Sequence, residues 1–296
     1  MKITVFTPTY NRAYIIDKLY RSLQRQTYED FEWLVVDDGS SDDTSQLFDT
    51  WQKEDNFFPI VYHKTENGGK HRAINSGVGM ARGELFFIVD SDDYLTDDAL
   101  GKVVEWYDGI EDKQQFCGVA GLRGYDELRP IGSTFKGTHL DASTLQREKN
   151  NIYGDKAEAF RTDIIRQFPF KEFYDEKFLT ETTVWFEIAG AGYKIRWFNE
   201  IIYICNYLED GLTRNIRKII ASNLEGTMYT VFIYNKYHRL TLPSRIALFS
   251  SICEIAERKG ISRKEIALKL DCSVMFLKFA CLIRKIKNKF MRNNEY

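Results

Sequence analysis

Three carboxylates lie within four residues in the stretch Asp90-Ser91-Asp92-Asp93. They directly follow residues 85–89, an apolar run with the composition of a buried strand. Carboxylate oxygens are the usual ligands of Mg²⁺ and Mn²⁺, and a divalent ion held there can neutralise a diphosphate. An isolated Asp-x-Asp is more often a turn or a helix cap. The cluster therefore predicts metal-assisted chemistry only if other loops supply complementary groups.

Two further loops carry polar residues of the required kind. The apolar-rich run at 31–36 ends at the stretch DDGSSD (37–42), and NGGKHR (67–72) opens a predicted helix. Glycines there would let the backbone approach a ligand, while Lys70 and Arg72 could face phosphate. Walker A and G-x-G-x-x-G motifs are absent, which disfavours a P-loop or a dinucleotide-binding fold. Ordinary turns and a solvated basic helix start are the alternative interpretations.

A fourth candidate is Glu181, which directly precedes an apolar helical segment containing Trp185 and Ile188. A carboxylate at that place could serve as a general base. The alternative is a first-turn glutamate that is favoured only by the helix dipole. No G-x-S-x-G motif and no cysteine–histidine signature supports a covalent hydrolase.

The elements around these residues alternate between strand and helix. Strand-like runs at 3–6, 31–36, 60–62 and 85–89 are separated by helical patterns near 15–23, 43–53 and 70–81. Such alternation predicts right-handed βαβ units and a mainly parallel sheet. Ligands of open α/β sheets bind beyond the carboxyl ends of the strands. We therefore expect the loops at 8–12, 37–42 and 90–93 to meet at one edge of the sheet.

Composition excludes several classes of protein. The 296 residues are 44% hydrophobic and 28% charged, with 5 prolines, 19 glycines and a net charge of −2. Disorder, a collagen-like fibre and a globally basic nucleic-acid binder are disfavoured. The 5 cysteines form no C-x-x-C pair, so we expect reduced thiols rather than disulfides or zinc. With neither a signal-peptide layout nor a long apolar stretch, we expect a cytoplasmic chain, or one peripheral at the inner face of the cell membrane.

Taken together, these stretches resemble the family 2 glycosyltransferases of the GT-A fold. The pattern runs through VFTPTYNR (5–12), VVDDGSSDDT (35–44), NGGK (67–70), NSG (75–77), ARGE (81–84) and DSDD (90–93). The resemblance covers about the first 215 residues and is densest in the first hundred. It implies an α/β, GT-A nucleotide-diphospho-sugar transferase fold with a mainly parallel central sheet. We expect a catalytic domain at 1–215, with nucleotide-sugar binding in 1–110 and the acceptor part in 111–215, and a helical region at 216–296.

The resemblance also implies where a nucleoside-diphosphate sugar would bind. One group would hold the nucleobase, with a carboxylate accepting from a uracil-type N–H, and a second group would lie near the ribose and the diphosphate. The first group is Pro8, Tyr10 and Asp38, and the second is Asn11, Arg12, Lys70 and Asp90. The stretch DGLTR (210–214) resembles a segment that closes over the diphosphate, which adds Arg214.

The resemblance also implies which residues would bind a metal ion and which residue would act as the catalytic base. Asp92 matches the metal-binding aspartate of the family, with Asp90 and Asp93 as further ligands of Mn²⁺ or Mg²⁺. The family base usually ends a Glu-Asp pair before a helix that leads to a Gly-Tyr-Lys turn. Counting back from Gly192, Glu181 takes the place of that aspartate and Thr180 that of the glutamate. A histidine that some relatives use as a metal ligand is absent from the stretch at 210–214.

The implied reaction is a single inverting displacement. Glu181 would accept the proton of an acceptor hydroxyl as that oxygen attacks the anomeric carbon of a UDP-sugar. The acceptor would be a glycan or a lipid-linked glycan in surface polysaccharide assembly. Two alternatives remain open, namely a catalytically degenerate sugar-nucleotide-binding scaffold and a nucleotidyltransferase. The second needs a G-x-x-x-R-type loop after the first strand, which residues 7–12 lack.

The C-terminal part has a separate character. Residues 258–292 hold eleven Lys/Arg and two acids, among apolar residues at helical spacing. This pattern is typical of a basic amphipathic helix at an anionic membrane surface. The alternative is a helix that packs on the catalytic domain or on a second subunit of an oligomer. Pro243 is expected to start the preceding helix and Gly260 to end it.

Overall fold

The computed structural model describes residues 1–206, 219, 222–238 and 240–293, with side chains described as far as residue 287. The chain forms two compact units, Met1–Phe170 with Glu187–Gly211, and Lys171–Phe186 with Leu212–Tyr296. Helix α6 (Thr182–Gly190) contains one of the boundaries between them. The expected domain boundary after residue 215 falls at 207–218, outside the described residues, and stays a prediction.

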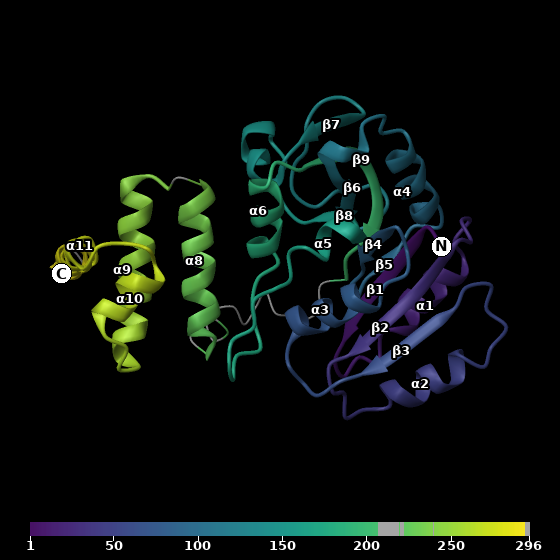
Figure 1. Cartoon of the computed structure of the whole chain (residues 1–296), viewed down its shortest axis with the longest axis horizontal. Coiled ribbons are helices and arrows are strands. Elements are labelled where there is room, and N and C mark those ends of the chain that lie inside the picture. The colour runs from purple at the N-terminus through teal and green to yellow at the C-terminus, as the bar shows by residue number, and fades with distance from the viewer. Residues whose placement is uncertain (207–218, 220–221, 239, 294–296) are drawn as a thin grey trace. The chain divides into compact units, whose positions relative to one another are not determined.

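The first unit is built on one sheet of nine strands, in which the predicted parallel arrangement holds for the first four along the chain (Figure 1). They lie in the order β3-β2-β1-β4, and every neighbouring pair is parallel. Their bounds are β1 (Ile3–Thr9), β2 (Phe31–Asp37), β3 (Ile60–Lys64) and β4 (Leu85–Ile88). The helices between them are α1 (Asp17–Gln24), α2 (Thr44–Trp51) and α3 (Lys70–Met80). The βαβ units read from the sequence are therefore confirmed.

The second half of the sheet is mixed. Strand β8 is antiparallel to both β4 and β6, β6 and β9 are parallel, and β5 and β7 are antiparallel to β9. The bounds are β5 (Tyr94–Leu95), β6 (Phe116–Gly124), β7 (His139–Ala142), β8 (Lys156–Arg161) and β9 (Lys194–Ile204). The helices here are α4 (Ala99–Asp108), α5 (Thr162–Ile165) and three 3₁₀ turns at 113–115, 144–146 and 148–150. Antiparallel partners need no crossover helix, so the strand–helix alternation carries no signal for this part.

Close packing places helix α3 against the sheet. A Cβ atom at Gly77 would lie 2.1 Å from the ring of Phe6 in β1, so only glycine lets the helix approach this strand. The other face of β1 and β2 packs into an aromatic core, where Trp33 Nε1 donates to Thr7 Oγ1 at 3.0 Å. This packing holds the first residue of α3, Lys70, near the carboxyl ends of the strands.

The second unit contains the helices α8 (Leu224–His238), α9 (Leu242–Arg258), α10 (Arg263–Lys269) and α11 (Val274–Asn293). Helix α9 begins as predicted, with Pro243 in its first turn and Thr241 as N-cap, and it ends before Gly260 at φ +81°. The basic segment 258–292 was expected as one helix, but it is divided between α10 and α11 around Asp271, at φ +49°. No helix in the described part of the chain combines the length and hydropathy of a membrane span.

Lys156 in β8 provides a test of the packing of the sheet. Only 2% of the residue is exposed, and its ammonium group donates to the backbone carbonyls of Ile131 and Tyr153. Burial, with the nearby charge of Arg147, lowers the pKa of Lys156 to about 8. Between this value and the unfolded pKa of about 10.4, the unfolded chain holds a proton that the folded chain has released.

We therefore expect the free energy of unfolding to rise with pH across this window, relative to the variant Lys156→Met, by about 1 kcal/mol per pH unit. The stability contribution is lost again as the pH falls through 8, where the folded lysine becomes protonated. Urea unfolding of both proteins at several pH values between 7.5 and 10 measures the difference. The exposed Lys149→Met is the matched control. A constant difference between wild type and Lys156→Met would contradict the prediction.

Candidate active site

The loops after β1 and β2 are joined by short hydrogen bonds. Asn11 has a positive φ of 52°, and its N–H donates to Ser40 Oγ at 2.8 Å, while its Oδ1 accepts from the N–H of Ser41 at 2.8 Å. Asp42 Oδ2 accepts from the N–H of Ala13 at 2.9 Å. Asparagine tolerates this left-handed backbone better than most residues. The two loops thus form one platform at the carboxyl ends of the strands, as expected from the sequence.

The predicted nucleobase residues flank this platform. Pro8 is buried within β1, and Tyr10 at the end of the strand is exposed. Arg12 is half-buried, and its guanidinium donates to the hydroxyl of Tyr14 at 2.7 Å. An exposed aromatic ring and a guanidinium beside a rigid loop can stack on a base and contact a phosphate.

Asp38 holds the loop that opens α3. Its Oδ1 accepts from the N–H of Gly68 at 2.6 Å, and its Oδ2 accepts from the N–H of Gly69 at 2.8 Å and from Asn67 Nδ2 at 3.0 Å. Gly69 has a φ of +95°, which glycine adopts without strain. The carboxylate that the family resemblance assigns to the nucleobase therefore also positions the start of α3 and Lys70.

Replacing Asp38 with Asn should destabilise the first unit by about 2 kcal/mol, because one carboxylate oxygen becomes an amide NH₂ facing an N–H donor. Urea unfolding measures this loss. Asp43→Asn is the matched control, since Asp43 is exposed and its side chain caps no helix. Equal stability of the two variants would show that the three hydrogen bonds to Asp38 do not hold the loop.

Asp90 lies between two cations. Its Oδ1 is 2.6 Å from Lys70 Nζ, and its Oδ2 is 3.3 Å from a terminal guanidinium nitrogen of Arg123 on β6. Burial alone would raise the pKa of the Asp90 carboxyl, but these two charges hold that pKa well below its usual range. The structure thus brings Lys70 and Asp90 together as expected and adds Arg123, which the motifs did not indicate.

Asp93 is held instead by hydrogen bonds to β9 and to the backbone just after this strand. Its Oδ2 accepts from the hydroxyl of Tyr203 at 2.8 Å, and its Oδ1 accepts from the N–H of Asn206 at 2.7 Å. The Tyr203 hydroxyl accepts in turn from the N–H of Asp90 at 2.9 Å, and the Arg123 guanidinium lies 4.1 Å from the Tyr203 ring centre. Burial and then the charge of Asp90 raise the pKa of Asp93 to about 7.

Arg123 and Tyr203 are the residues of this cluster that motif reading missed. They lie 33 and 113 positions from Asp90 along the chain. One signal was available for Arg123, because it is the only charged residue in the strand FCGVAGLRG. A charged side chain in a buried strand needs a partner of opposite charge.

Asp92 differs from its two neighbours. No hydrogen bond or ion pair joins its carboxylate to another of the described residues, and burial followed by the charge of Asp90 raises its pKa. A half-buried carboxylate of this kind fits a divalent cation. Mg²⁺ is commonly held by one or two carboxylates together with substrate phosphates. Since Asp90 and Asp93 have other partners and the described residues form no cluster of three metal-ligating side chains, the geometry fits an ion held mainly by Asp92.

The remaining predicted residues lie elsewhere. Glu181 belongs to the second unit, directly before α6, and its backbone carbonyl accepts from the N–H groups of Val184 and Trp185 at 3.0 and 3.1 Å. Its backbone therefore begins the helix, as predicted. Arg214 lies outside the described residues.

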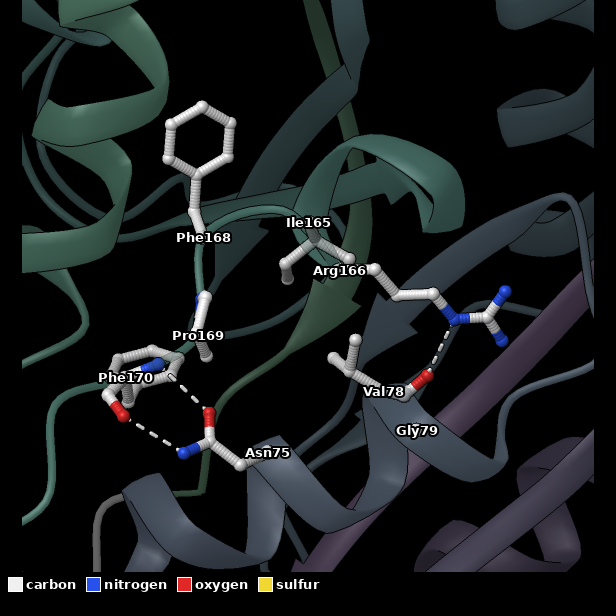
Figure 2. A pocket seen from close by; sticks show the side chains of 8 residues that line it. All are labelled: Asn75, Val78, Gly79, Ile165, Arg166, Phe168, Pro169 and Phe170. Carbon is white, nitrogen blue, oxygen red and sulfur yellow. Dashed lines mark hydrogen bonds between the residues drawn. The ribbon is translucent and has the colours of Figure 1, made fainter.

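A small cavity of about 130 Å³ lies further along α3 (Figure 2). Its walls are mostly apolar, from Val78, Ile165 and the residues at 168–170. The side-chain amide of Asn75 exchanges two hydrogen bonds with the backbone of Phe170, and Arg166 donates to the carbonyl of Val78 (Figure 2). Because these polar groups already have partners, the cavity offers no reactive group and stands apart from the strand-end cluster.

The strand-end geometry agrees with a family comparison. Residues 4–169 match the model of glycosyl transferase family 2. The chain belongs to this family. Its relatives include the GalNAc(5)-diNAcBac-PP-undecaprenol beta-1,3-glucosyltransferase of Campylobacter jejuni, 26% identical over 62% of this chain and 58% of the relative. The poly(ribitol-phosphate) beta-N-acetylglucosaminyltransferase TarS of Staphylococcus aureus is 34% identical over 42% of this chain and 22% of TarS. The chain thus spans less than two thirds of the length of either relative.

Solved structures of other glycosyltransferases have the same fold as this chain. S. aureus TarS in complex with UDP-GlcNAc superposes with a TM-score of 0.65 at 18% identity, covering 99% of this chain and 92% of that one. The mannosyltransferase PcManGT of Pyrobaculum calidifontis, in complex with GDP-Man and Mn²⁺, gives a TM-score of 0.56 at 18% identity, covering 96% of this chain and 75% of that one. The expected GT-A fold is confirmed.

Proposed function

We propose that this chain transfers a sugar from UDP-sugar to a hydroxyl group of a glycan or lipid-linked glycan acceptor, with inversion at the anomeric carbon. The observation that carries the proposal is the cluster at the ends of β1, β2 and β4. There the carboxylate of Asp92, which has no partner among the described residues, lies beside an Asp90 that is already neutralised by Lys70 and Arg123. Family membership supports the class of reaction.

The donor would bind along the joined loops. Pro8, Tyr10 and Asp38 would hold the uracil, and Asn11, Arg12, Lys70 and Asp90 the ribose and diphosphate. The choice of uracil is supported by TarS, whose structure holds UDP-GlcNAc, whereas PcManGT holds GDP-Man. The Lys70 ammonium and the Arg12 guanidinium supply the positive charge that a departing diphosphate needs, with Arg214 proposed as a third cation.

In the transfer step, the Glu181 carboxylate would accept the acceptor hydroxyl proton while that oxygen forms the new bond to the anomeric carbon. The bond from this carbon to the diphosphate oxygen breaks in the same step, and UDP leaves with both bonding electrons. Mn²⁺ or Mg²⁺, held by Asp92 with Asp90 and Asp93 nearby, would supply charge neutralisation of the diphosphate when bound. The chain itself supplies position, charge and the base.

The acceptor and the location of the protein are inferred from relatives. The C. jejuni relative is named for an undecaprenol-linked acceptor and TarS for poly(ribitol phosphate). We propose a comparable surface-glycan acceptor, reached from the cytoplasm. The catalytic part would be 1–215, with the donor half at 1–110, and 216–296 would be an accessory helical region.

The test is direct binding followed by product analysis. We expect UDP with Mn²⁺ to bind at least tenfold more tightly than CDP by calorimetry, because Asp38 would accept from the uracil N3–H, which cytosine lacks. NMR of the product anomer should show inversion of an α-linked donor to a β-linked product. Tight, metal-dependent UDP binding without turnover on any acceptor would favour a degenerate scaffold instead. Release of diphosphate from a nucleoside triphosphate and sugar phosphate would favour a nucleotidyltransferase.

A further inference from the structure

Helix α11 has two apolar faces, and one of them is accounted for by packing. Leu277, Ala280 and Cys281 are buried in a core that includes Phe249 and Cys253 of α9. Arg284 follows on the same face, where its guanidinium pairs with Glu254 of α9 at 3.1 Å. This face anchors α11 within the second unit.

The other apolar face is exposed. We call it the outer stripe, and it consists of Met275, Phe279, Leu282 and Ile286, with exposed fractions of 81%, 49%, 56% and 48%. Their spacing of four, three and four residues places them on one line of an α-helix. At about 100° per residue, this line lies roughly opposite the buried face. Large apolar side chains gathered in this way mark an interaction surface.

Cations border the outer stripe. Lys278 and Lys285 lie along one edge of it and Lys287 beyond the other, and all three are exposed. The sequence of α11 holds six Lys/Arg and neither Asp nor Glu. Only Arg284 among the described side chains of this helix forms an ion pair within the second unit. The surface therefore combines an apolar stripe with uncompensated positive charge.

We propose that the outer stripe of α11 binds in the interface of an anionic lipid bilayer. A lipid surface matches both features, because acyl chains accept the apolar side chains and anionic headgroups accept the lysines. A second copy of the chain matches poorly, since pairing two outer stripes would bring the three lysines that border one stripe toward the three that border the other. Lysine side chains can bury their methylene stems while the ammonium groups stay at headgroup level. This attachment is independent of the transfer reaction proposed above.

Flotation of the full chain with vesicles tests the proposal, in the absence of any donor or acceptor. We expect binding to vesicles of phosphatidylcholine with phosphatidylglycerol and little binding to phosphatidylcholine alone. The double variant Phe279→Ser/Leu282→Ser should lose roughly tenfold in partitioning for each side chain removed. Lys278→Glu/Lys285→Glu should lose about fivefold or more for each lysine. All four side chains are exposed, so neither variant should disturb the core.

Matched controls carry the same chemical changes elsewhere. Leu128→Ser removes an exposed leucine of the first unit, and Lys18→Glu/Lys53→Glu makes an equal change of net charge. Both should float like the wild type. Equal flotation of wild type and outer-stripe variants, or binding to neutral vesicles alone, would overturn the proposal. So would a dimer in light scattering that Phe279→Ser/Leu282→Ser converts to a monomer, because a second copy would then occupy the stripe.

Discussion

Asp92→Asn is expected to lower sugar-transfer turnover roughly a thousandfold, the loss typical when a charge-stabilising group for a departing anion is removed. Its carboxylate alone in the Asp90–Asp93 stretch has no partner among the described residues. The same change should leave the free energy of unfolding equal or slightly higher, because it relieves repulsion between Asp92 and Asp90. Donor turnover and urea unfolding, measured on one preparation, check both expectations.

Turnover and stability, measured together, distinguish a carboxylate that acts in the reaction from one that only supports the fold. Asp93→Asn is the matched comparison, because Asp93 accepts hydrogen bonds from Tyr203 and from the backbone of Asn206. That variant should lose stability, as an amide NH₂ replaces one of the two accepting oxygens. Near-normal turnover of Asp92→Asn, or a loss explained entirely by unfolding, would rule out the proposed role of Asp92.

Glu181→Gln is expected to lower kcat by about 10²–10⁴-fold, the range for loss of a general base. The KM for the donor should change little, because the base acts on the acceptor hydroxyl. Steady-state kinetics with saturating acceptor measure both parameters.

A control variant in α6 distinguishes a catalytic base from a glutamate that only interacts favourably with the helix dipole. Glu187→Gln removes a carboxylate from α6 and should retain most of the turnover. If Glu181→Gln behaves like Glu187→Gln, the interpretation of Glu181 as a first-turn helix residue is the correct one. Loss of UDP binding by Glu181→Gln would likewise exclude a role confined to the acceptor.

Much of the first half of the fold was predictable because its signals are local. Apolar runs of strand length, such as Phe31–Asp37, end abruptly at polar residues. Parallel strands then carry those polar ends to one edge of the sheet. The hydrogen bonds of Asn11 to Ser40 and Ser41, and of Asp38 to Gly68 and Gly69, confirm this meeting of loops. The mixed half was not predictable in this way, because β8 pairs with β4 across more than seventy residues of chain.

The sequence by itself determined the chemical groups of the site and the strand ends that carry them, since both depend on residue type and short-range periodicity. Only the tertiary structure decided how the three carboxylates differ. Asp90 is neutralised by Lys70 and Arg123, Asp93 is bound to Tyr203, and Asp92 is left free among the described residues. Adjacent aspartates are equivalent in a motif, but their charge state depends on burial and on partners from β6 and β9 that are distant along the chain.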